Sequence, residues 1–128
     1  MKIHRLFSLV VPFALITCAL PALANSATLS PQEIQSTWVD KTVGATLATS
    51  FWQKAKPFDI RLKKDGSAEL AGSFVDSGTW RISDKGFCTT WKVIRPGEER
   101  CFTVVKNGEQ TQLINPDGSV NATILKIN

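Results

Sequence analysis

The chain has 128 residues, 43% of them apolar, and a formal net charge of +4. This length is enough for one small globular domain and too short for a second catalytic one. The only histidine and the only methionine, His4 and Met1, stand at the start of the chain, and tyrosine is absent. Their absence from the rest of the chain excludes His-dependent triads and His-ligated zinc or haem there. General-base catalysis near neutral pH also becomes improbable, so we expect neither an enzyme nor a cofactor or metal.

Residues 1–24 are predicted to be a cleavable export signal. Lys2 and Arg5 provide a positively charged start, residues 6–20 form a nearly continuous apolar run, and residues 21–24 end in small side chains where signal peptidase cuts. The apolar run is shorter than the roughly 20 residues that a membrane-spanning helix needs. The segment is therefore typical of a signal peptide rather than of a membrane anchor.

Cleavage after Ala24 would leave residues 25–128 as a single domain. Because Lys2 and Arg5 are removed, its net charge falls from +4 to +2, too small a surplus to indicate nucleic-acid binding. We expect a periplasmic or secreted protein without a stable membrane anchor. A lipid anchor on Cys18 is kept as an alternative, although the residues before it fit a lipoprotein signal poorly.

Cys88 and Cys101 are predicted to form a disulfide, because an exported chain meets an oxidising environment. A redox pair or a thiolate metal site would call for CxxC spacing or further ligands, which the sequence lacks. If Cys88 faces Cys101 across a hairpin, Phe87 faces Phe102 on the other side of the same strands. The aromatic pair is then expected in the core and the disulfide on the outer or end surface.

One helix is predicted over residues 31–40. Ser30-Pro31-Gln32-Glu33 is a capping box with proline at the first helical position. Ile34 and Trp38 lie one turn apart and give the helix one apolar face. A helix of this length is not stable alone, so we expect that face to cover or plug one end of the domain.

The chain after Gly44 predicts about eight short antiparallel strands. Apolar and polar residues alternate with period two, and turn residues such as Asp65-Gly66 and Asn107-Gly108 recur about every ten residues. This pattern predicts an all-β fold, an up-and-down meander forming a small barrel or sandwich with the short helix at its N-terminal side. The expected strands are residues 46–53, 58–62, 68–74, 80–82, 87–94, 100–106, 110–114 and 120–127.

Four short motifs occur in a distinctive order: Gly78-Thr79-Trp80, then Cys88-Thr89-Thr90-Trp91, then Cys101-Phe102, then Asn107-Gly108. In this order the sequence resembles an uncharacterised family (a domain of unknown function) of small exported bacterial proteins, over roughly residues 65–127. The resemblance implies a lipocalin-like, disulfide-bonded β-barrel. It brings no catalytic residues and no established activity.

Aromatic residues are the first candidates for a binding site. Trp52, Trp80 and Trp91 are predicted to line an apolar ligand cavity, with simple filling of a small core as the alternative. We therefore expect a non-catalytic barrel that binds a small apolar or lipid-like ligand.

Basic residues are the second candidates. Arg61 and Arg81 are candidate contacts for an anionic group, unless they only solvate the outer face of their strands. The alternative function is a protein-binding module, such as an inhibitor of a cell-wall hydrolase or another partner in the cell envelope. Such a module would present an exposed loop, expected at residues 76–79 or 95–98. The acidic residues stand at positions typical of a solvated surface, so no catalytic pair is expected.

Overall fold

The computed structural model describes residues 10–12, 14, 26–48 and 56–128. Trp52, Cys18 and most of the expected export signal lie outside these residues. In chain order the described elements are β1 (Ser26–Thr28), α1 (Pro31–Trp38), β2 (Val43–Leu47), β3 (Pro57–Leu62), β4 (Ser67–Gly72), β5 (Asp76–Ile82), β6 (Phe87–Trp91), β7 (Arg100–Asn107), β8 (Gln110–Ile114) and β9 (Val120–Ile127).

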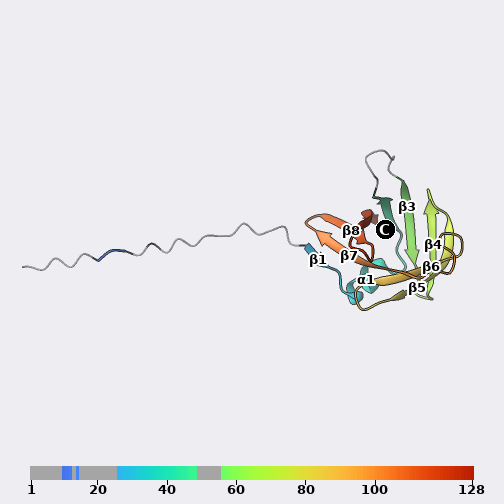
Figure 1. The fold of residues 1–128 in the computed structure, drawn as a ribbon, viewed down its shortest axis with the longest axis horizontal. Helices are drawn as coiled ribbons and strands as arrows, with labels where there is room; N and C mark the ends of the chain where they lie inside the picture. Colours follow the sequence, from blue (N-terminus) through green and yellow to red (C-terminus); the bar gives the residue numbers. More distant parts are fainter. Residues whose placement is uncertain (1–9, 13, 15–25, 49–55) are drawn as a thin grey trace, which may run out of the picture.

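The strands β2 to β9 form a closed eight-stranded antiparallel barrel (Figure 1). Each strand pairs with its neighbour in the order β7-β6-β5-β4-β3-β2-β9-β8, and pairing of β7 with β8 closes the ring. The short strand β1 is added outside the ring, along β7 beyond the part that pairs with β6. The predicted all-β barrel is confirmed, and closure leaves the eight strands of the ring without unpaired edges.

Strand register decides which side chains face the interior. Directly paired residues lie on the same side of a sheet, so the pairs Phe87–Phe102 and Val104–Leu113 continue one inner row around the barrel. Phe87, Val104 and Leu113 are almost completely buried. The predicted facing of Phe87 and Phe102 is therefore confirmed. The buried core comprises Ile34, Trp38, Val43, Ala45, Phe58, Ile60, Leu62, Ala68, Phe87, Val104, Leu113 and Ala122.

The helix α1 closes one end of the barrel, the lower end in Figure 1. Its capping box is present: the Glu33 N–H donates to the Ser30 Oγ, and the Ser30 N–H donates to the Glu33 Oε1, each at 3.2 Å. Ile34 and Trp38 are completely buried, and the Trp38 ring centre lies 5.7 Å from that of Phe87. The helix ends at Trp38 rather than at the expected residue 40, because Val39 already has an extended backbone with a ψ of 133°.

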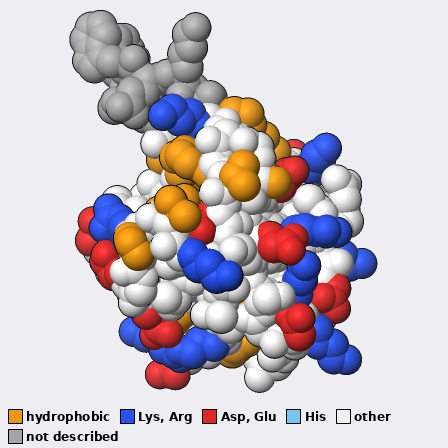
Figure 2. All heavy atoms as spheres, turned by 90° about the vertical axis from the view of Figure 1, so that its right-hand side faces the viewer, with side chains coloured by type: hydrophobic (Ala, Val, Ile, Leu, Met, Phe, Trp, Pro, Cys, Tyr) orange, Lys and Arg blue, Asp and Glu red, His pale blue; other side chains and the backbone are white. Residues whose placement is uncertain are grey.

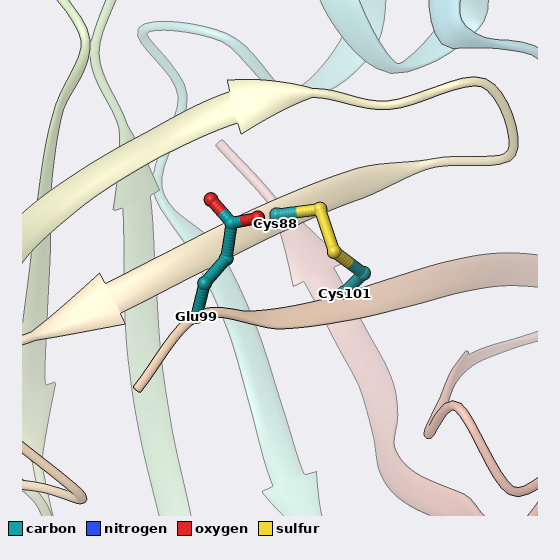
Figure 3. Close-up of side chains that lie close together, drawn as sticks. All are labelled: Cys88, Glu99 and Cys101. Carbon is teal, nitrogen blue, oxygen red and sulfur yellow. A yellow bond between two sulfur atoms is a disulfide. The ribbon is translucent and has the colours of Figure 1, made fainter. Parts of the chain in front are cut away.

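The disulfide between Cys88 and Cys101 is present and links directly paired residues of β6 and β7, with Cα atoms 3.9 Å apart. As predicted, the cysteines face away from Phe87 and Phe102. Cys88 is nevertheless only 1% exposed. The outer surface of this hairpin is covered by neighbouring side chains, one of which, Glu99, lies beside the sulfur atoms (Figure 3).

Several strand boundaries differ from the sequence-based expectation: β2 begins at Val43 instead of residue 46, and β4 ends at Gly72 instead of residue 74. The strand β6 ends at Trp91 instead of residue 94, so residues 92–99 form a longer connection to β7. The strand β5 begins at Asp76, so residues 76–79, expected as a possible exposed loop, are part of the barrel wall. The strand β1 was not predicted, because three exposed residues carry no periodic signal.

Candidate ligand-binding cavity

An apolar cavity of about 160 Å³ lies inside the barrel, at the end away from α1. This is the end at which β2 finishes and β3 begins, the upper end in Figure 1. Phe87 lies between the cavity and Trp38 of the helix, so its ring forms part of the floor. The lining residues are Leu47, Phe58, Ile60, Leu70, Phe74, Phe87, Thr89, Trp91, Ile94, Arg95, Glu98, Arg100, Phe102, Leu113 and Asn121.

Aromatic side chains give the cavity much of its wall. The rings of Phe58 and Phe74 meet edge to face with centres 5.9 Å apart, and the rings of Phe87 and Phe102 are tilted with centres 5.7 Å apart. The edge-to-face pair is favourable because the electron-poor edge of one ring meets the electron-rich face of the other. Both pairs present aromatic surface to the cavity.

The connection between β6 and β7, residues 92–99, forms part of the rim. Ile94, Arg95 and Glu98 of this connection line the cavity, and Arg95 forms an ion pair with Glu98 at 3.8 Å. The connection contains no helix or strand, and a backbone hydrogen bond from the Lys92 N–H to the Ser77 carbonyl, at 3.1 Å, joins it to β5.

Asp76, at the start of β5, holds this connection in place. One carboxylate oxygen accepts hydrogen bonds from the Ser77 N–H at 2.7 Å and the Val93 N–H at 3.2 Å. The other accepts from the Val93 N–H at 3.1 Å and the Ile94 N–H at 2.7 Å. Burial raises the pKa of Asp76, but the N–H groups of Ile94, Ser77 and Val93 outweigh this effect and hold it below its ordinary value.

The sequence did not identify Asp76 as important, because its partners lie 17 and 18 residues away along the chain. Its carboxylate was expected at the solvated surface, yet the residue is only 8% exposed. Arg100 was also missed, although a signal for it existed. It lies two residues before Phe102 on β7, so period-two alternation places both side chains on the inner face of the barrel.

The three tryptophans predicted to line a ligand site have different surroundings. Trp91 lines the cavity. Trp80 is absent from the lining: it packs against the core, and its indole N–H donates to the Lys63 carbonyl at 2.6 Å. Trp52 lies outside the described residues. Of these three tryptophans the structure describes two, and one of the two therefore lines the cavity.

The two arginines predicted to contact an anion lie at different places on the outer surface. Arg61 lines a shallow groove over β3 to β5, close to Asp59 and Glu69. Arg81 is held by Glu99 through two hydrogen bonds, from Nη2 at 2.6 Å and from Nε at 3.0 Å. These bonds raise the pKa of Arg81 and lower the pKa of Glu99. The structure therefore does not bring the two arginines together.

Cys88, Glu99 and Cys101 place possible metal-ligand atoms within 4.8 Å of one another (Figure 3). Both sulfur atoms belong to the disulfide, and Glu99 is engaged by Arg81. A disulfide sulfur lacks the thiolate charge that binds metal ions. This cluster is therefore a disulfide flanked by an ion pair.

Compared with known protein families, curated proteins and solved structures, the chain shows no match. The resemblance to the uncharacterised exported family thus stays a prediction. No helix in the described part of the chain combines the length and the apolar character needed to cross a membrane.

Proposed function

We propose that the protein is an exported, non-catalytic barrel that binds a small apolar ligand in the interior cavity. The observation that carries this proposal is the apolar, aromatic-walled space of about 160 Å³ at one end of a barrel whose other end is filled by Trp38. An apolar space of about 150 Å³ accepts a molecule the size of benzene. The volume supports a ligand with one ring or a short branched chain rather than a lipid with long acyl chains.

Export is supported by the disulfide, which fits an oxidising compartment, and by the composition of the first 24 residues. A non-catalytic role is supported by the surroundings of the buried carboxylate. Asp76 is occupied by backbone N–H groups that hold a loop, which leaves it without the features of a general base.

Native mass spectrometry of protein purified without denaturation from its own host tests whether the cavity carries a ligand. A discrete adduct on the oxidised chain is the expected result.

Calorimetric titration with toluene, a neutral single-ring probe, tests the cavity directly. Leu47→Phe, which adds a ring to the cavity wall, should abolish toluene binding. Val75→Phe adds a ring to the outer surface, where Val75 is 78% exposed, and should leave binding unchanged. Equal binding by both variants would contradict the proposal.

Protein binding is the second candidate function, and exposed apolar side chains favour it. Val75 and Val93 are 78% and 72% exposed and line the same outer groove. Figure 2 shows hydrophobic side chains gathered in the upper part of one face, whereas charged side chains of both signs cover its lower part. Exposed apolar clusters of this kind mark protein contacts. Loss of a captured envelope protein in the Val75→Ser/Val93→Ser variant, with toluene binding retained, would support this candidate.

A further inference from the structure

The inner wall of the cavity carries two polar groups that lie directly opposite each other on neighbouring strands. Thr89 of β6 is paired with Arg100 of β7, and both line the cavity. Thr89 is 2% exposed, and its hydroxyl has no hydrogen-bond partner among the described residues. A buried hydroxyl without a partner is costly, so its presence in an apolar wall requires an explanation.

Arg100 differs from Arg81 and Arg95, which form ion pairs. Arg81 and Arg95 each have a carboxylate within 4.0 Å, whereas no described carboxylate lies that close to Arg100. Its guanidinium carbon lies 6.0 Å from the centre of the Phe102 ring, on the side of β7 that faces the interior. The head group therefore rests against the apolar wall.

Other charges near this end of the barrel leave the guanidinium available. Glu98 also lines the cavity but forms an ion pair with Arg95, so the charged lining keeps one positive charge in excess. Asp117, in the turn after β8, interacts electrostatically with Arg100 at longer range. The pKa of Asp117 is lowered mainly by hydrogen bonds from Ser119 and only in small part by the charge of Arg100.

We propose that the cavity selects small carboxylic acids with one aromatic ring or a short branched chain. The apolar part would occupy the space between the phenylalanine rings, and the carboxylate would accept hydrogen bonds from the Arg100 guanidinium and the Thr89 hydroxyl. A guanidinium matches the two oxygens of a carboxylate, and an apolar surrounding strengthens such bonds. This inference rests on the proposed function and adds the chemical class of the ligand.

Three probes of one size separate charge from shape: benzoate, toluene and benzylamine, titrated by calorimetry into the full protein at pH 7. We expect benzoate to bind at least about tenfold more tightly than toluene, and benzylamine more weakly than both. Arg100→Met should remove the advantage of benzoate while leaving toluene affinity unchanged. Arg95→Met, which removes an equal charge that Glu98 already neutralises, should reduce benzoate affinity much less.

Thr89→Val provides a second test that does not risk unfolding. It preserves the shape of the side chain and removes the unpartnered hydroxyl, so the melting temperature of the ligand-free protein should rise. Benzoate affinity should fall severalfold, and toluene affinity should not.

The outcomes of these titrations distinguish the two proposals. Equal binding of toluene and benzoate, or unchanged benzoate binding in Arg100→Met, would overturn selection for carboxylates and leave the apolar site standing. Absence of binding by any single-ring probe would overturn the proposed function itself.

Discussion

Reduction of the Cys88–Cys101 disulfide should cost a large part of the stability of this domain. The cysteines are 13 positions apart, so the bond closes a loop of 14 residues. Restricting a loop of this size in the unfolded chain corresponds to about 3 kcal/mol of stabilisation. A small domain has only about 5–15 kcal/mol in total, and a loss of 3 kcal/mol corresponds to a fall in melting temperature on the order of 10–20 °C.

The measurement is urea denaturation followed by circular dichroism, on the oxidised and the fully reduced protein. The two states contain the same side chains, so the difference reports the bond and not a change in packing. The double variant Cys88→Ala/Cys101→Ala is the control, because reductant should not alter its unfolding curve. A difference below about 1 kcal/mol between oxidised and reduced protein would refute the chain-entropy reasoning, since it would mean that the unfolded chain is already restricted here.

Further variants at four positions test packing, capping and charge. Trp38→Ala should lower the unfolding free energy by about 3–5 kcal/mol in urea titrations, because the ring is completely buried; a loss near zero would show that α1 does not close the barrel. Gly78→Ala should prevent native folding, because a Cβ at this position would overlap the Thr90 carbonyl. The measurement is the loss of dispersed amide signals in NMR. A folded variant would contradict the pairing of β5 with β6. Ser30→Ala should cost about 1 kcal/mol in thermal melts by removing the helix cap, and Ser30→Gly clearly less. Asp76→Asn should lower the free energy of unfolding at neutral pH. The difference in this free energy between wild type and variant should shrink as pH falls below 3.8. A difference that does not change with pH would exclude a charge effect.

The direction of the Asp76 effect follows from linkage. Its pKa is lower in the folded protein than the ordinary value of 3.8. The ionised carboxylate therefore stabilises the fold at every pH above the unfolded-state value, and this contribution is lost as pH falls through the folded-state value. The same acidification should loosen residues 92–99, which amide exchange of Val93 and Ile94 would detect, because Asp76 accepts their N–H groups.

Much of the barrel could be predicted because its signals are local. Alternation marked most strands, and the strands predicted at residues 110–114 and 120–127 have the observed bounds. Pairing Cys88 with Cys101 set the register of the β6–β7 hairpin, and this placed Phe87 opposite Phe102 in the core. The capping box gave the start of α1 at Pro31. In each case the physical cause lies within a single element or a single hairpin.

The features that were missed depend on distant contacts. Asp76 is buried because the connection between β6 and β7, 17 residues further along the chain, packs over it. No local sequence pattern predicts this contact. Trp80 looked equivalent to Trp91 in sequence, yet its indole N–H donates a hydrogen bond to the Lys63 carbonyl, in the turn between β3 and β4. A cavity is a difference between the space inside a closed ring and the volume of its inward side chains, so it follows only from the packed structure.

The asymmetry of the barrel explains why the cavity, the proposed binding site, lies at one end. At the end covered by α1, the helix adds the large Trp38 ring to the barrel interior, and this ring packs against Phe87. At the other end no described helix supplies such a group, and part of the rim is a connection held by the Asp76 carboxylate and by backbone hydrogen bonds. Large rings at that end pack against each other instead of filling the centre, and the space between them stays open. A protein that needed only a stable core could fill this space with larger side chains at Thr89 or Leu113. Among the described residues, the Thr89 hydroxyl has no hydrogen-bond partner and Arg100 has no carboxylate within 4.0 Å, and the proposed carboxylic acid would satisfy both groups.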